Sequence, residues 1–130
     1  MASWEDVREI GLGLPETEET ESREGNRVLT VRGKGFVWER PLRRADLAAL
    51  GDAAPAGPVL CAHVPDVGAK EALIADDPAT FFTTPHFNGF PAVLVRLDVI
   101  TLDELREVTV EAWLAKAPKR LAKTYLDGAG

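Results

Sequence analysis

Apolar residues near the start of the chain recur at the spacing of a helix face. Trp4, Val7 and Ile10 follow one another at three-residue intervals. They come after Ser3, with Asp6 three residues later, a pair suited to capping the start of a helix. Two glycines and a proline then interrupt the pattern. We therefore expect a short first helix.

The next forty residues alternate between polar turns and short β-prone runs. Residues 16–25 are acidic and lack apolar periodicity, which predicts a loop or an edge segment. Residues 27–32 and 36–40 are rich in Val, Thr, Phe and Trp, and residues 33–35 supply two glycines between them. This combination predicts two antiparallel strands joined by a tight turn with positive φ angles. Residues 44–50 then predict one or two helical turns.

The middle of the chain predicts a further strand, a helix and a second hairpin. Residues 59–64 are apolar enough for a central strand, and residues 67–75 have a helical pattern. Residues 83–87 and 92–97 flank Asn88–Gly89, a dipeptide that favours hairpin turns. We expect these two segments to pair as strands.

The C-terminal part predicts two helices. Thr101 and Glu104 form a capping box before an apolar stripe, and Pro118 opens a last short helix. Hairpins without alternating βαβ units favour an α+β fold. We expect a mostly antiparallel sheet with helices on one face and the other face partly open.

Composition is that of a single soluble domain. The 130 residues are 45% hydrophobic and 28% charged, which is enough for one core but not for two. No apolar run approaches the roughly 20 residues that span a bilayer, and the N-terminus lacks the pattern of a secretory signal. Cys61 is the single cysteine and lies in an apolar run, so we expect a buried thiol in a cytoplasmic protein.

Charge is unevenly distributed. The net charge of -6 argues against a generally basic nucleic-acid-binding protein. Residues 26–44, here called the basic hairpin, nevertheless hold one acid and six bases. The bases are Arg27, Arg32, Lys34, Arg40, Arg43 and Arg44. This hairpin is the candidate surface for binding phosphates.

Near the C-terminus the two signs of charge separate along the chain. The acids come first and the bases follow, as Asp103, Glu104, Glu107 and Glu111, then Lys116, Lys119, Arg120 and Lys123. Acids early and bases late complement a helix dipole, so the simplest interpretation is solvated helix ends.

One patch of residues suggests ligand binding. Residues 84–90 crowd two phenylalanines, a histidine and an asparagine into one turn region. With Trp38, the side chains of His86, Phe87 and Asn88 could stack on a ring or bind a small ligand. The alternative is that Phe87 and its neighbours fill the core and that the polar residues serve the turn.

Specific catalytic or metal chemistry is not indicated. His63 and His86 could meet near Cys61 and Asp66, but this spacing defines neither a zinc site nor a Cys–His pair. The Gly-Lys-Gly at residues 33–35 precedes a strand instead of the helix of a phosphate-binding loop. We expect no catalytic residue, no metal and no cofactor.

Several segments in a shared order resemble a known family. They are residues 13–16, 31–36, 70–74, 81–90, 92–97, 111–113 and 117–120. Together these segments, which span nearly the whole chain, resemble the MmcQ/YjbR family of small bacterial proteins. The resemblance implies an α-β3-α-β2-α fold, similar to that of secretion chaperones, and DNA binding through wing-like hairpins, with no catalytic residues. This chain departs from the family pattern by its acidity and by an insertion at about residues 43–57.

Three functions therefore remain open. The first is a non-enzymatic DNA-binding module that uses the basic hairpin. The second is a protein-binding or chaperone-like module, with an acidic surface and self-association. The third is a small-ligand pocket around Trp38, His86 and Phe87.

Overall fold

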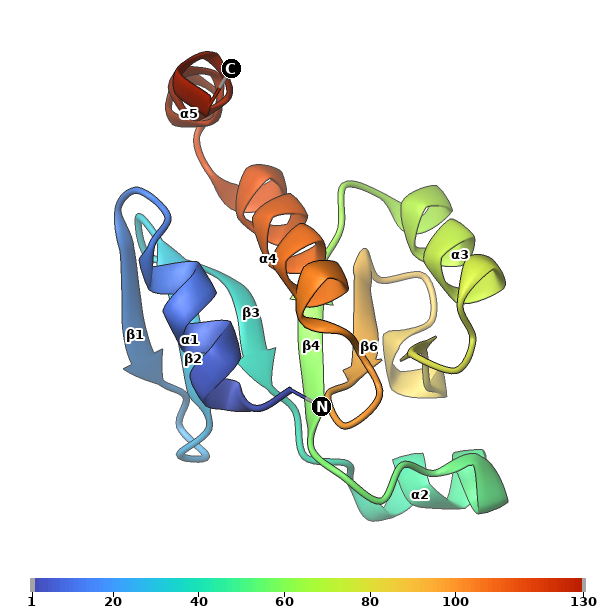
Figure 1. Cartoon of the computed structure of the whole chain (residues 1–130). Coiled ribbons are helices and arrows are strands. Elements are labelled where there is room, and N and C mark those ends of the chain that lie inside the picture. Colours follow the sequence, from blue (N-terminus) through green and yellow to red (C-terminus); the bar gives the residue numbers. More distant parts are fainter. Residues whose placement is uncertain (1, 130) are drawn as a thin grey trace.

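The computed structural model describes residues 2–129 (Figure 1). In chain order the elements are α1 (Trp4–Leu12), β1 (Thr17–Glu21), β2 (Arg27–Val31), β3 (Lys34–Glu39), α2 (Arg44–Leu50), the 3-10 helix η1 (Gly51–Ala53), β4 (Val59–His63), α3 (Val67–Asp76), β5 (Phe81–Phe82), the 3-10 helix η2 (Pro85–Phe87), β6 (Ala92–Arg96), α4 (Leu102–Lys116) and α5 (Lys119–Ala129). The six strands form one antiparallel sheet in the order β1-β2-β3-β4-β6-β5. The predicted α+β class is confirmed.

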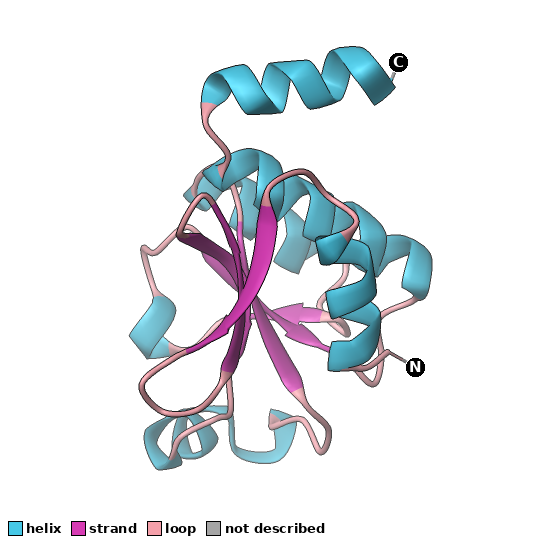
Figure 2. Cartoon of the chain, turned by 90° about the vertical axis from the view of Figure 1, so that its left-hand side faces the viewer, coloured by secondary structure: helices cyan, strands magenta, loops and turns pink. Residues whose placement is uncertain are grey.

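The long helices gather on one side of the sheet, as predicted. Figure 1 shows α1 and α4 in front of the strands, with α3 to the right of β6, and in the turned view of Figure 2 helices gather on one side of the sheet. Both predicted helix starts are capped. The Ser3 N–H donates to the Asp6 carboxylate at 2.9 Å, and the Glu104 N–H donates to the Thr101 hydroxyl at 3.1 Å. Local sequence signals therefore set where α1 and α4 begin.

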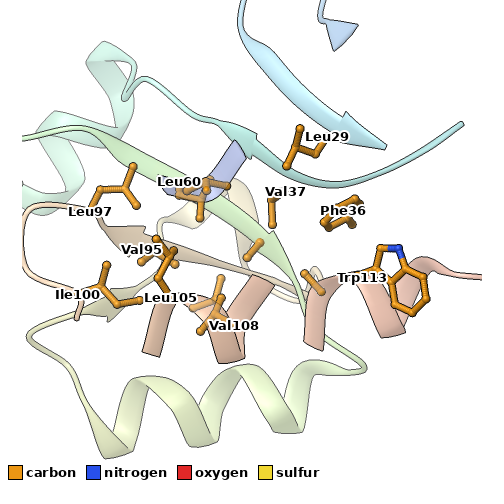
Figure 3. Packing of buried hydrophobic residues seen from close by; sticks show 14 of the residues in the cluster. Leu29, Phe36, Val37, Leu60, Val95, Leu97, Ile100, Leu105, Val108 and Trp113 are labelled. Carbon is orange, nitrogen blue, oxygen red and sulfur yellow. The ribbon is translucent and has the colours of Figure 1, made fainter. Parts of the chain in front are cut away.

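The main core lies between the sheet and these helices (Figure 3). Leu60 and Val95 face each other on neighbouring strands β4 and β6, and both are fully buried. Trp113 of α4 is also fully buried, and its indole N–H donates to the Pro15 carbonyl at 3.1 Å. This hydrogen bond ties α4 to the loop after α1 and satisfies the one side-chain polar atom of Trp113.

A smaller apolar cluster covers part of the opposite face. Its buried members are Val59, Cys61, Phe82, Phe87, Ala92 and Leu94. Phe87 comes from η2, so the loop between β5 and β6 covers the sheet there. Over β2 the same face carries Val28 and Thr30, which stay partly exposed. The expectation of a partly open second face agrees with this arrangement.

The acidic segment after α1 is an edge strand. Residues 17–21 pair with β2 along their whole length, and four of these five residues are exposed. Apolar periodicity could not find this strand because none of its residues needs a core position. Its glutamates also discourage pairing with another chain at the open edge.

The first hairpin turn lies one residue earlier than predicted. Val31 pairs with Lys34, so the two-residue turn is Arg32–Gly33, with φ angles of 47° and 82°. Two consecutive positive φ angles match the right-handed twist of the flanking strands. Gly35 belongs to β3 instead of the turn.

The predicted strand at residues 83–87 is wrong. The strand is Phe81–Phe82, and residues 85–87 form a 3-10 helix that begins with Pro85. Proline has no N–H for a sheet ladder but suits the first position of a helix. Asn88–Gly89 does form a turn, closed by the Phe90 N–H on the Phe87 carbonyl at 3.1 Å. This turn lies within the long connection from β5 to β6 instead of joining them directly.

None of the helices in the described part of the chain is long and apolar enough to cross a membrane.

Candidate functional site

The cations of the basic hairpin are mostly engaged with carboxylates of the same chain. The ion pairs join Arg27 to Glu5 and Glu39, Arg32 to Glu16, Arg40 to Asp46, and Arg43 to Glu24. Within residues 2–129 only Lys34 and Arg44 of the predicted set have no such partner. Lys34 begins β3 near α5, whereas Arg44 begins α2 at the other end of the sheet (Figure 1). The six residues therefore do not form one continuous patch, and their role in DNA binding stays a prediction.

Arg40 is a structural cation. Its side chain is 9% exposed, and it donates to Asp46 at 3.2 Å, where the carboxylate is 5% exposed. It also donates to the Pro41 carbonyl. Burial alone would raise the pKa of Asp46, but the Arg43 backbone N–H and the Arg40 charge lower that pKa below its usual value. The pair fixes the start of α2 against the sheet.

Three of the four residues predicted to bind a ligand meet in one hollow. Trp38, His86 and Phe87 line a hollow of about 470 Å³, together with Arg40 and Arg43. We call this the aromatic hollow. Its other lining residues are Ser22, Glu24, Asn26, Glu39, Pro41 and Leu42. Asn88, the fourth predicted residue, is exposed and does not line it. The structure thus brings predicted ligand-binding residues and two predicted DNA-binding arginines into one hollow.

The wall that carries Phe87 is held from behind by a buried lysine. Lys70 of α3 is 3% exposed, and its ammonium group donates to the carbonyls of Phe87 and, at 3.1 Å, Phe90. Burial lowers the pKa of Lys70. Sequence reasoning missed this residue because a lysine in a helical pattern is normally solvated.

His63 and His86 pack against aromatic rings and do not form a metal site or a Cys–His pair with Cys61 and Asp66. The ring of His63 lies between Trp38, at 5.2 Å, and Phe90, at 5.5 Å, whereas His86 packs against Phe87 at 5.0 Å. Burial, and then the charge of Lys116, lower the pKa of His63. No three His, Cys, Asp or Glu side chains are grouped to hold a metal in the part of the chain that the structure covers.

Cys61 is buried in the smaller cluster, as expected. Burial raises the pKa of its thiol to about 12, although the charges of Arg40 and Lys70 oppose the rise. A thiol that stays protonated at neutral pH is a poor nucleophile.

A second hollow gathers lysines from three elements. Lys34 of β3, Lys116 of α4, and Lys119 and Lys123 of α5 line about 670 Å³, with Asp127 as the one acidic residue. We call this the lysine hollow. Between residues 2 and 129 none of these four ammonium groups has an ion-pair partner. Apolar residues of the corner between α4 and α5 form the rest of its wall.

The break between α4 and α5 changes how these charges must be interpreted. The prediction took the early acids and late bases as complements of helix dipoles, which holds for α4, with Asp103 and Glu104 first and Lys116 last. In α5 the bases stand at the positive N-terminal end, and its first turn has no acid. Pro118 marks this break in the sequence. The prediction nevertheless treated the charges of residues 103–123 as if they belonged to one helix.

A sequence model of the YjbR family matches residues 12–115. The chain belongs to the YjbR family. It is 47% identical over its whole length to an uncharacterized protein of Mycobacterium tuberculosis and to one of Mycobacterium bovis, and it covers 100% of each. The crystal structure of a Deinococcus radiodurans protein with a DUF419 domain has a TM-score of 0.64 at 19% identity, covering 88% of this chain and 78% of that one. That likeness confirms the fold.

The two hollows differ in how much of each lies within the segment matched by the YjbR model. The whole aromatic hollow lies within residues 12–115. Of the four lysines in the lysine hollow, only Lys34 lies within the matched segment. The aromatic hollow is therefore built entirely from the YjbR domain, whereas the lysine hollow depends on the end of α4 and on α5.

Proposed function

We propose that this YjbR protein is a non-enzymatic nucleic-acid-binding module that contacts phosphates through the lysine hollow. The observation that carries the proposal is the convergence of four ammonium groups without ion-pair partners in residues 2–129. Binding of nucleic acid rests largely on cations that displace counterions from phosphates.

Helix energetics support this interpretation of the lysines. Cations near a helix N-terminus are unfavourable because the exposed N–H groups there carry partial positive charge. Lys119 and Arg120 open α5, and Lys123 follows one turn later. A phosphate beside these residues would be attracted by both the side chains and the helix end.

The acidic remainder of the molecule limits how the contact can form. With a net charge of -6, the chain repels nucleic acid over most of its surface. Four of the five guanidinium groups of the basic hairpin would also have to leave their carboxylates to bind phosphate. Lys34 and Arg44 have no such partner within residues 2–129, and of these two only Lys34 lines the lysine hollow. The proposal therefore keeps Lys34 of the hairpin as a contact and moves the main surface to α5.

The test is fluorescence-anisotropy titration of labelled single- and double-stranded DNA between about 50 and 200 mM salt. Four phosphate contacts to duplex DNA predict a slope of log K against log salt near about -3.6, or roughly a 100-fold loss of affinity over this range. The variant Lys116→Gln/Lys119→Gln/Lys123→Gln should reduce the slope to near about -0.9.

The control variant removes the same charge from the basic hairpin, as Arg27→Gln/Arg32→Gln/Arg43→Gln. These guanidinium groups are in exposed ion pairs, so their loss should cost little stability. We expect this variant to bind DNA much as the wild type does. Loss of binding in the hairpin variant with retention in the lysine variant would instead assign the interface to the basic hairpin. No salt-dependent binding at about 50 mM salt would reject nucleic-acid binding altogether.

A further inference from the structure

Trp38 differs from the other two tryptophans of the chain. Trp4 and Trp113 are buried, and their indole N–H groups donate to Glu19 at 3.0 Å and to Pro15 at 3.1 Å. Trp38 is only half buried, and its indole N–H has no acceptor within residues 2–129. A tryptophan that keeps an open face and an unused donor in a hollow is suited to contacting another molecule.

The walls around Trp38 are fixed before any ligand arrives. The Arg40 guanidinium lies 5.2 Å from the centre of the Phe87 ring and is held by Asp46. Behind Phe87, Lys70 holds the backbone of the same segment. Trp38 itself is braced by the ring of His63. A preformed hollow loses little conformational entropy on binding, which favours a small rigid ligand.

The charges lining the hollow balance one another. Arg40 pairs with Asp46, Arg43 with Glu24, and Glu39 accepts the Arg27 N–H at 2.7 Å. The hollow therefore does not select a polyanion, in contrast to the lysine hollow.

Unused hydrogen-bonding groups remain beside the rings. In the described chain the Asn26 side-chain amide, which lines the hollow, has no hydrogen-bond partner. Together with the Trp38 N–H, this amide offers both donors and an acceptor. A hydrocarbon ring would leave them unpaired, whereas a ring with polar edges would satisfy them.

We infer that the aromatic hollow binds a planar heteroaromatic ring of the nucleobase class. The ring stacks on Trp38 and His86, with the nearly buried Phe87 as part of the wall, and its polar edge faces the side-chain amide of Asn26. A volume of about 470 Å³ suits a ligand of nucleoside size. The ring can come from a free nucleotide or from an unpaired base of a strand. This inference does not depend on phosphate binding at the lysine hollow, which involves other residues.

The experiment is isothermal titration calorimetry of the full chain with adenosine, guanosine, cytidine and uridine and with their 5′-monophosphates. Ribose 5-phosphate serves as the ligand without a base, and short single-stranded oligonucleotides test the second source of the ring. Trp38→Ala should weaken ring binding by roughly 10-fold or more, the usual effect of removing a stacking partner. His86→Ala should weaken it in the same direction, and because His86 is exposed this variant keeps the fold.

The variant Lys116→Gln/Lys119→Gln/Lys123→Gln separates the two proposals. It should bind nucleosides like the wild type even where it no longer binds duplex DNA. Saturable binding of nucleosides that is lost in the Trp38 and His86 variants supports a site for the ring of a free nucleotide. Saturable binding of oligonucleotides alone, lost in the same variants, supports a site for an unpaired base of a strand. Absence of saturable binding for every base, equal binding of ribose 5-phosphate, or indifference to both substitutions would overturn the inference.

Discussion

Replacing Asp46 with alanine should destabilise the protein far more than any exposed ion-pair change. The Arg40 side chain is only 9% exposed, and its Nη2 lies 3.2 Å from Oδ2 of Asp46. The substitution removes this carboxylate and leaves the buried guanidinium without a counter-charge. It also removes the acceptor of the Arg43 N–H at 2.9 Å, which caps α2. Breaking one partner of a buried pair typically costs about 3–5 kcal/mol. For a chain of this size, that corresponds to a fall in Tm of roughly 11–18 °C.

The assay is urea unfolding followed by circular dichroism, with a matched exposed pair as control. Glu24→Ala breaks the pair with Arg43, whose side chains are 58% and 65% exposed, and should cost less than about 1 kcal/mol. The double variant Arg40→Met/Asp46→Leu should recover much of the loss, because no unpaired charge remains buried. The reasoning fails if Asp46→Ala is no more destabilising than Glu24→Ala.

The same pair predicts how stability depends on pH. Because the pKa of Asp46 is lowered in the folded state, its contribution is complete above the pKa of the unfolded chain. That contribution is lost as the pH falls through the lower folded pKa. The difference in unfolding free energy between wild type and Asp46→Ala should therefore be constant near neutral pH and shrink below about pH 4. An unchanged difference in acid would mean that the carboxylate charge does not stabilise the fold.

Three further predictions concern buried positions. Lys70→Met should speed amide hydrogen exchange in residues 83–91 by roughly 10-fold, measured by mass spectrometry, because two buried carbonyls lose their donor. Cys61 should resist a thiol-specific reagent at neutral pH until denaturant is added, since burial raises its pKa to about 12; rapid labelling of the folded protein would contradict this. Gly11→Ala should cost about 1–3 kcal/mol in chemical denaturation, because its Cβ would collide with the buried Leu29 side chain; an unchanged midpoint would show that the core adjusts.

Much of the fold follows from local patterns in the chain. The caps at Ser3 and Thr101 place the starts of α1 and α4, and periodicity predicts most of the strands. The wrong strand at residues 83–87 lies where a proline and a non-local contact both opposed the β-prone pattern. β-Prone residues and a turn dipeptide suggested a strand at residues 83–87, yet Pro85 and the anchor from Lys70 favour a 3-10 helix over the sheet.

The candidate sites show the same division. The sequence was sufficient to single out His86 and Phe87, because aromatic residues and a histidine crowded near a turn are unusual, and Trp38 was considered with them as an aromatic residue of the basic hairpin. It was not sufficient to place them with Arg40 and Arg43, since residues about 40 positions apart meet only through sheet pairing and the return of the loop before β6.

By itself, the sequence determined the fold class and the residue types available for binding, because these depend on composition and on spacing within one element. Only the tertiary structure decided which charges are free. Carboxylates from α1, β3, α2 and the turns on either side of β1 neutralise four arginines of the basic hairpin, whereas the break before α5 leaves Lys119 and Lys123 without partners in residues 2–129. Salt screens interactions between exposed charges that are more than about 8–10 Å apart, so the pairing depends on neighbours in three dimensions and cannot be summed along a chain.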